Sequence, residues 1–167
     1  MIARATVKVI LPLACAWVRR QEALILGTGV ALSTAQLADA RRIGVEHPER
    51  VRLKFVDRVP LPLSLLRKVA GKFLAFPTDP IGITLGYGIF IRSQYANDRR
   101  LLLHELAHTL QYERFGGIRP FLAQYLQECL TTGYAFASLE DEARRRSEAI
   151  ASSPESSLDT ETRDPHL

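Results

Sequence analysis

Histidine, cysteine and tryptophan are all scarce in this chain of 167 residues. It contains four histidines, two cysteines and one tryptophan. Two cysteines allow at most one disulfide, and Cys15 and Cys129 both stand in apolar surroundings and form no Cys-x-x-Cys pair. We expect two buried free thiols in a reducing compartment, with a single disulfide as the alternative.

The chain also lacks an apolar run that would suit a membrane-spanning helix. The best candidate, residues 7–18, is about a dozen residues long, whereas a span needs about 20. Basic residues near its start give it a faint likeness to a signal peptide. Pro12 interrupts the run, however, and Trp17 continues the hydrophobicity beyond its small residues. We expect a first structural helix, no transmembrane span and a cytoplasmic protein, with export as the alternative.

The chain has more basic than acidic residues, but the basic residues are not clustered in one stretch. The net charge is +4 and the isoelectric point is about 9.3. Arginine pairs such as Arg19-Arg20, Arg41-Arg42 and Arg99-Arg100 are scattered among periodic apolar residues, which is typical of solvated helix faces. We therefore expect no nucleic-acid partner, although a basic nucleic-acid-binding protein stays a second alternative function. Hydrophobic residues at 47% and charged residues at 24% indicate a globular protein.

The hydrophobic periodicity predicts a mostly helical chain with a few strands. Ser33 and Gln36 form a capping-box pattern, and Gly44 is placed to end the helix that they begin. We expect Asn97 or Asp98 to cap the helix at 98–115, and Ser138, followed by Asp141, to cap the helix at 139–150. We expect helices at 5–26, 34–43, 63–74, 98–115, 120–132 and 139–150, and a strand at 51–55. Residues 151–167 are rich in Ser, Thr, Pro and acidic residues, and we expect a disordered tail.

Residues 81–91 form a distinct segment in which apolar residues alternate with Gly82, Gly86 and Gly88. Alternation with a period of two predicts a strand or a hairpin. If the glycines lie on one side, another backbone can approach closely, as an extended peptide does when it pairs with an edge strand. The alternative is a tight hairpin in which the glycines serve only the turn.

The stretch from Leu101 to Gln111 carries the clearest chemical signal, because it contains His104-Glu105-Leu106-Ala107-His108. Residues four apart lie one turn apart on the same face of a helix, so both imidazoles can bind one zinc ion. Glu105 borders that face and can reach a metal-bound water, as a general base must. The alternative is an ordinary core helix with two buried histidines.

Two histidines need a third protein ligand to make a catalytic zinc site. No third histidine follows at a suitable spacing, since the next one is His166, and His47 stands beside a proline in a turn-like dipeptide. The third ligand should then be a carboxylate. Glu113 is rotated about 180° from His104, and Glu128 is expected on the exposed side of the next helix.

The acidic cluster Glu140-Asp141-Glu142 opens the final predicted helix, about thirty residues downstream. Glu140 shares a helical face with the small Ala143, which would let two helices approach each other. We favour Glu140 over Glu142 as the third ligand. The alternative is that these acidic residues bind no metal and only interact favourably with the positive end of the helix dipole.

These residues resemble the gluzincin branch of the HExxH zinc metallopeptidases, and residues 81–146 are similar to small bacterial HExxH domains of zincin-like type. The resemblance implies an α+β fold, mostly helical, with a small antiparallel sheet beside the active-site helix. It implies that Zn²⁺ is held by His104, His108 and Glu140, and that Glu105 is the general base. A gluzincin usually has Asp or Asn four residues after the third ligand, whereas this chain has Arg144.

The leading functional hypothesis is therefore a zinc metallopeptidase that hydrolyses peptide or protein substrates. It would occupy a single domain of residues 1–150, with N-terminal helices at 1–50 and a catalytic core at about 51–150. Gln111 lies one turn beyond His108 and could contact a ligand or the substrate. Tyr134 or Tyr87 could stabilise the oxyanion. The alternative from a different class is a non-catalytic zinc-binding or interaction module.

Overall fold

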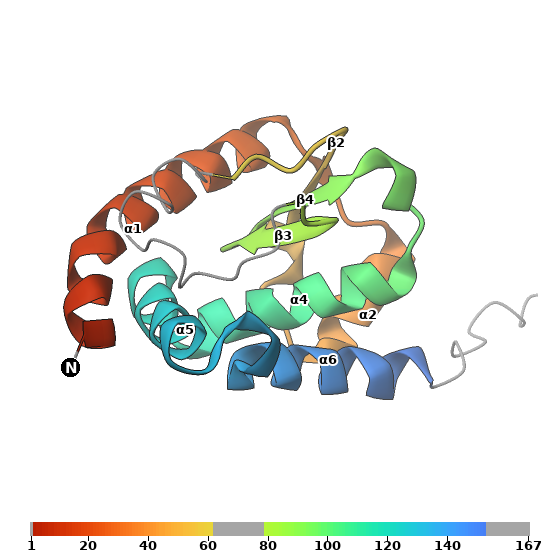
Figure 1. The fold of residues 1–167 in the computed structure, drawn as a ribbon. Coiled ribbons are helices and arrows are strands. Elements are labelled where there is room, and N and C mark those ends of the chain that lie inside the picture. The colour runs from red at the N-terminus through yellow and green to blue at the C-terminus, as the bar shows by residue number, and fades with distance from the viewer. Residues whose placement is uncertain (1, 62–78, 153–167) are drawn as a thin grey trace, which may run out of the picture.

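The computed structural model describes residues 2–61 and 79–152 and has the predicted α+β fold, in which helices predominate (Figure 1). The helices are α1 (Ile2–Thr28), α2 (Thr34–Ile43), α4 (Arg99–Arg114), α5 (Ile118–Thr132) and α6 (Ser138–Ala151). The strands are β1 (Val30–Ala31), β2 (Arg52–Val56), β3 (Gly82–Leu85) and β4 (Gly88–Arg92), with short 3₁₀ turns η1 (Pro48–Arg50), η3 (Ser93–Tyr95) and η4 (Tyr134–Phe136). The helix predicted at 63–74 and the tail from residue 153 onward lie outside the described residues.

The sheet is mixed, which corrects the expectation of an antiparallel one. Its strand order is β1-β2-β4-β3. The β1–β2 and β3–β4 pairs are antiparallel, but β2 and β4 run parallel, with Leu53 opposite Ile89. The parallel pair arises because β3 takes the outer edge, so its hairpin partner β4 enters beside β2 in the same direction. Residues 88–91 of β4 are all buried, as befits a central strand.

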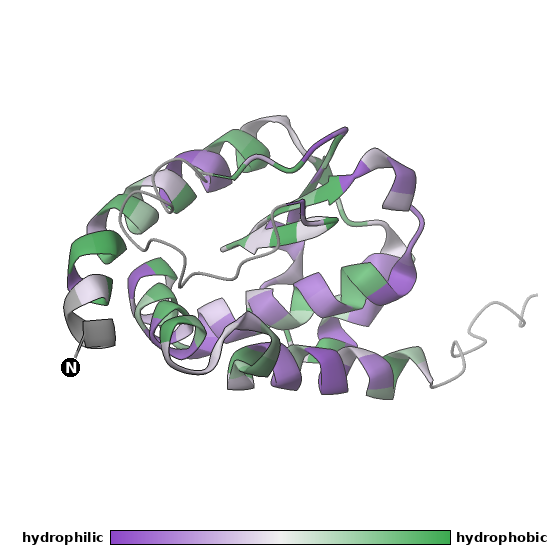
Figure 2. Cartoon of the chain, in the orientation of Figure 1, coloured by the Kyte–Doolittle hydropathy of each residue, from purple (hydrophilic) through white to green (hydrophobic). Residues whose placement is uncertain are grey.

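The sheet separates two apolar cores. Residues of the hairpin that face α1, such as Phe90, join a core with α1 and α5. Residues on the other face, such as Ile89 and Ile91, join a core with α2, α4 and α6. Figure 1 shows α1 along one side of the sheet and α4 along the other. Figure 2 shows a mainly hydrophobic β3–β4 hairpin between them and a mainly hydrophilic α6 at the outside.

The predicted hairpin is present, but its glycines do not lie on one side. Gly86 has φ +69° and serves the turn. Gly82 pairs with Ile91, and Leu85 pairs with Gly88. Even-numbered residues of β3 therefore lie on the same face of the sheet as odd-numbered residues of β4, so Gly82 and Gly88 lie on opposite faces. A Cβ at Gly88 would lie 2.9 Å from Ile25 of α1, whereas one at Gly82 would lie 2.6 Å from the Glu105 carboxylate. Gly88 therefore leaves room for Ile25 of α1, and Gly82 leaves room for Glu105 of α4.

Most helix ends follow the predicted signals. Ser33 and Gln36 form the capping box of α2, and Gly44 ends it at φ 105°. Asp98 caps α4 by accepting the Leu101 N–H. Ser138 was expected to cap α6 and does not, since Ala137 is the N-cap residue and has no side-chain cap. Instead, the carboxylate of Glu128 in α5 accepts a hydrogen bond of 3.1 Å from the N–H of Leu139, at the start of α6.

Three further expectations bear on the chain as a whole. Cys15 and Cys129 are free and buried, as predicted. Pro12 lies inside α1, which continues through it. None of the helices in the described ranges combines the length and the apolar character that crossing a membrane requires.

Candidate metal centre

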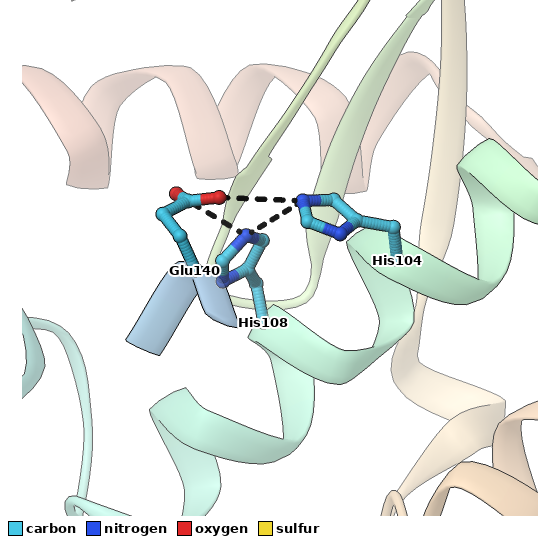
Figure 3. A group of neighbouring side chains, drawn as sticks. All are labelled: His104, His108 and Glu140. Atoms are coloured by element: carbon cyan, nitrogen blue, oxygen red, sulfur yellow. Dashed lines mark hydrogen bonds and ion pairs between the residues drawn. The ribbon is translucent and has the colours of Figure 1, made fainter. Parts of the chain in front are cut away.

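Helix α4 presents His104 and His108 to the same point. The two residues lie one turn apart, and their Nε2 atoms are 3.2 Å apart. His108 is buried, while the side chain of His104 is 25% exposed. Figure 3 shows both rings turned toward the carboxylate of Glu140. The helical spacing thus gives the convergence that the sequence predicts.

Glu140 completes a triangle of donor atoms from the first turn of α6. Its Oε2 lies 3.5 Å from His104 Nε2, and its Oε1 lies 3.6 Å from His108 Nε2. A tetrahedral zinc ion with ligands at about 2.0–2.2 Å keeps its ligand atoms about 3.3–3.6 Å apart. The observed separations of 3.2, 3.5 and 3.6 Å are close to this range, and the two carboxylate separations are measured to different oxygens of Glu140. The three residues form the one group in the described part of the chain that can hold a metal in this way.

Contacts between α4 and α6 bring Glu140 to the histidines. The two helices run antiparallel and pack closely, with Ala143 fully buried between them (Figure 1). Glu142 forms a bidentate pair with Arg114 at 2.6 and 2.7 Å. Glu142 is therefore occupied away from the histidines, and the structure places Glu140 beside them. Of the two carboxylates that the sequence offers, only Glu140 lies in the candidate site.

Gln111 determines which nitrogen of His108 faces the site. Its Nε2 donates to the carbonyl of Leu139 at 2.9 Å and to Glu142 at 3.1 Å, and both of these groups can only accept. The amide oxygen must then face His108 Nδ1, 2.9 Å away, so that nitrogen carries the proton. Nε2 is then the nitrogen that faces the site and can bind a metal. Gln111 thus contacts a candidate ligand.

Two phenols surround Glu140. Tyr125 donates a hydrogen bond of 2.5 Å to Glu140 Oε1, and Tyr134 also hydrogen-bonds the carboxylate. Burial alone would raise the pKa of Glu140, but hydrogen bonds from His104 and His108 hold it well below its usual range. Glu140 is therefore ionised, as a metal ligand must be. Sequence reasoning missed Tyr125, because its helical stripe explained it as a core residue.

The same interactions act in reverse on His108. Burial would lower its pKa, but the hydrogen bond and the charge of Glu140 raise it to about 9. In the absence of metal, His108 therefore keeps a proton beside the Glu140 carboxylate, and a metal ion bound to His108 would displace that proton.

Glu105 lies between α4 and the hairpin with 4% of its surface exposed. The hydroxyl of Thr84 lies 2.6 Å from Glu105 Oε2 and 2.9 Å from the Glu105 carbonyl, so it can donate to either. Burial raises the pKa of Glu105, opposed by the nearby histidines and by the Thr84 hydrogen bond. A raised pKa suits a general base, which must take up a proton near neutral pH. Neither Thr84 nor Gly82 was expected to touch this carboxylate.

Several other candidates lie elsewhere. The Tyr87 hydroxyl donates to Glu113 at 3.0 Å, on the far side of α4 from the histidines, so Tyr87 does not reach the site. Glu113 also accepts the N–H groups of Glu46 and His47, which gives it a structural role. Arg144 pairs with Asp141.

A cavity of about 160 Å³ opens beside the donor triangle, and His104, Glu105, His108 and Glu140 all line it. Its remaining walls are mainly apolar and come from α1, β3 and α5. The candidate centre therefore adjoins a space that a substrate group can enter.

Comparison with protein-family models, with curated proteins and with solved structures gave no match to this chain. The resemblance to gluzincins stays a prediction from the sequence motif.

Proposed function

We propose that this protein is a zinc-dependent hydrolase, and specifically a metallopeptidase. The observation that carries the proposal is the triangle of His104, His108 and Glu140, whose sides suit tetrahedral zinc. Glu105, which the reaction needs as a base, stands on the same helix and lines the same cavity.

Bound zinc would lower the pKa of a coordinated water and polarise the carbonyl to be attacked. The protein's own part begins with Glu105. Thr84 engages Oε2 of its carboxylate, which leaves Oε1 to take the proton from the water and later pass it to the leaving amine. Gln111 holds His108 in the tautomer that binds metal through Nε2.

The outer edge of β3, which pairs with no other strand among residues 2–61 and 79–152, supports a peptide as the substrate. Ile81 pairs with β4 through its carbonyl, so the alternation of an antiparallel ladder points the backbone groups of Gly82 and Thr84 away from β4. The Thr84 carbonyl already accepts a hydrogen bond from Tyr112 at 3.4 Å. The backbone of Gly82, which borders the same cavity as the histidines, is where an extended peptide would pair with the edge.

The test combines metal analysis with digestion of a broad peptide library. The purified protein should contain one zinc per chain and cleave peptides. Glu105→Gln should keep the zinc and lose at least about 100-fold in turnover. Glu148→Gln is the matched control, because Glu148 is exposed on α6, and it should behave as the wild type does.

Three outcomes would contradict the proposal in different ways. Stoichiometric zinc without cleavage of any peptide would favour a non-catalytic module in which zinc joins α4 to α6. A protein that takes up no zinc at neutral pH would exclude both the enzyme and the module. Binding to DNA or RNA that weakens with salt and survives a chelator would favour the nucleic-acid alternative.

A further inference from the structure

The cavity beside the donor triangle has an unusually apolar wall for a space that contains three ionisable residue types. Helix α1 contributes Trp17 and Val18, and α5 contributes Phe121, Leu122 and Leu126. The last three are 3–7% exposed, and they pack in the core that α1 and α5 share. The polar groups of the lining contact one another, Thr84 with Glu105 and Tyr125 with Glu140.

Tyr125 joins the apolar and the polar lining of this cavity. Its ring stacks on Phe121 with centroids 5.5 Å apart, while its hydroxyl donates to Glu140. The apolar wall and the candidate metal ligand are thus parts of one packed unit. A group packed against the rings of Phe121 and Tyr125 would therefore lie beside the residue that hydrogen-bonds Glu140.

The volume of the cavity limits the size of that group. An apolar cavity of about 150 Å³ in another protein stays dry and binds benzene. The cavity here is about 160 Å³ and is partly open to solvent, so the part of a ligand that it encloses matches a phenyl ring or a branched aliphatic group in size. A charged group would lose its hydration there without gaining a partner at the apolar wall.

We propose that this cavity is a specificity pocket for a substrate side chain of about the size of benzene, such as that of Phe, Leu or Met, next to the bond that is hydrolysed. The proposal rests on the proposed hydrolase function. It assigns Ala14, Leu122 and Leu126 as residues that determine specificity, because they are apolar residues that line the cavity.

Trp17 makes the pocket observable by fluorescence, since it is the single tryptophan of the chain and lines the cavity. The probes are acetohydroxamate and 3-phenylpropanohydroxamate, which share a zinc-binding head and differ in the apolar group. With the zinc-loaded protein, the phenyl compound should bind at least about tenfold more tightly and alter the emission of Trp17. Equal affinities would overturn the proposal.

A cavity-filling variant tests the location of the binding. Ala14→Leu should fill the pocket and reduce the advantage of the phenyl compound to less than about threefold, while acetohydroxamate binds as before. Ala16→Leu is the matched control, because Ala16 is on the exposed side of α1, and it should keep the advantage. An unchanged preference in Ala14→Leu would overturn the proposal. Leu122→Phe serves the same purpose if Ala14→Leu does not fold.

Failure of the pocket and failure of the function give different results. If acetohydroxamate binds and the phenyl group adds nothing, the pocket is wrong and the zinc site stands. If neither hydroxamate binds, the zinc site is wrong, and benzene added to the metal-free protein decides the pocket alone. Quenching of Trp17 by benzene in the wild type, lost in Ala14→Leu, would support the pocket, and an unchanged emission would overturn it.

Discussion

At the scale of single residues, two side chains of the site are each held by a polar neighbour, His108 by Gln111 and Glu105 by Thr84. Gln111 is fully buried, and all three of its hydrogen bonds join α4 to α6 or hold His108. Glu105 is held from the sheet by Thr84. Such neighbours fix the orientation of ligands and bases, and their loss affects metal affinity or turnover separately.

Replacing Gln111 with methionine tests the first of these neighbours. The change keeps the volume but removes the acceptor for His108 Nδ1 and the donor to Leu139. Zinc affinity should fall by about 10- to 100-fold, because the tautomer of His108 is no longer fixed. Competition with a chromophoric chelator measures it. Gln94→Leu on the exposed surface should leave the affinity unchanged, and an equal affinity in both variants would contradict the assigned role.

Gly82→Ala tests the space over which Glu105 lies. A Cβ there would come within 2.6 Å of Glu105 Oε1, which forces the flexible carboxylate to move. Turnover should fall by about tenfold or more, whereas zinc affinity should stay within about twofold, since a misplaced base slows the chemistry without touching the ligands. Gly27→Ala, which meets nothing within 4 Å, is the control. A parallel loss of zinc would show that the strand itself had shifted.

Local spacing was enough to predict much of this site. His104 and His108 converge because they are four apart on a helix, and Glu140 was favoured because Ala143 shares its face. Thr84, Gly82 and Tyr125 could not be predicted, because their contacts depend on how a hairpin and a separate helix pack against α4. No pattern within either segment encodes that packing.

At the scale of elements, the junction of α4 with α6 decides which carboxylate reaches the histidines. Glu140 faces His104 and His108, and Glu142, half a turn further on, pairs with Arg114. The arrangement couples stability to the site, because the same pair of helices carries the ligands and the ion pair.

The pair of variants Glu140→Ala and Glu142→Ala separates these roles. Glu140→Ala should lower zinc affinity by at least about 100-fold, since it removes a ligand. Glu142→Ala should lower the free energy of unfolding by about 1 kcal/mol and weaken zinc by no more than about tenfold, through Gln111. Zinc titration and urea unfolding measure the two effects. The opposite ranking of zinc affinities would make Glu142 the ligand.

The hairpin is joined to the other side of α4 by Tyr87 and Glu113. Burial, followed by the hydrogen bond to Glu113, raises the pKa of Tyr87 from 10.0 to about 12. A raised pKa means that the folded state keeps a proton that the unfolded state loses. The resulting stability is complete below about pH 10 and decreases as the pH rises toward 12. Tyr87→Phe should show a smaller loss over that window in alkaline unfolding. Identical pH profiles would contradict the contact.

The elements also show where prediction from sequence ends. The capping box at Ser33 and the N-cap at Asp98 act within one turn of chain, so local residues determine them. The parallel pairing of β2 with β4 brings together Leu53 and Ile89, which are far apart in the sequence. The hydrophobic periodicity of each strand predicts the strand itself and does not specify which other strand it pairs with. The cap of α6 comes from Glu128 in another helix, which is why the local Ser138 signal failed.

At the scale of the whole molecule, the sheet lies between two cores and α4 contributes to both. Tyr112 belongs to the core with α1 and α5, and Leu103 and Leu106 belong to the core with α2 and α6. The candidate centre stands where α4 passes from one core to the other. This position explains how the site can have the α6 ligand on one side and an apolar cavity from α1 and α5 on the other. It also makes the donor triangle a product of the tertiary fold.

The most direct test is crystallography of the protein grown with zinc, with diffraction recorded on both sides of the zinc absorption edge. We predict one anomalous peak about 2.0–2.2 Å from Nε2 of His104, Nε2 of His108 and a carboxylate oxygen of Glu140. A zinc peak at other residues, or a zinc-soaked crystal in which these three side chains bind no metal, would contradict the account.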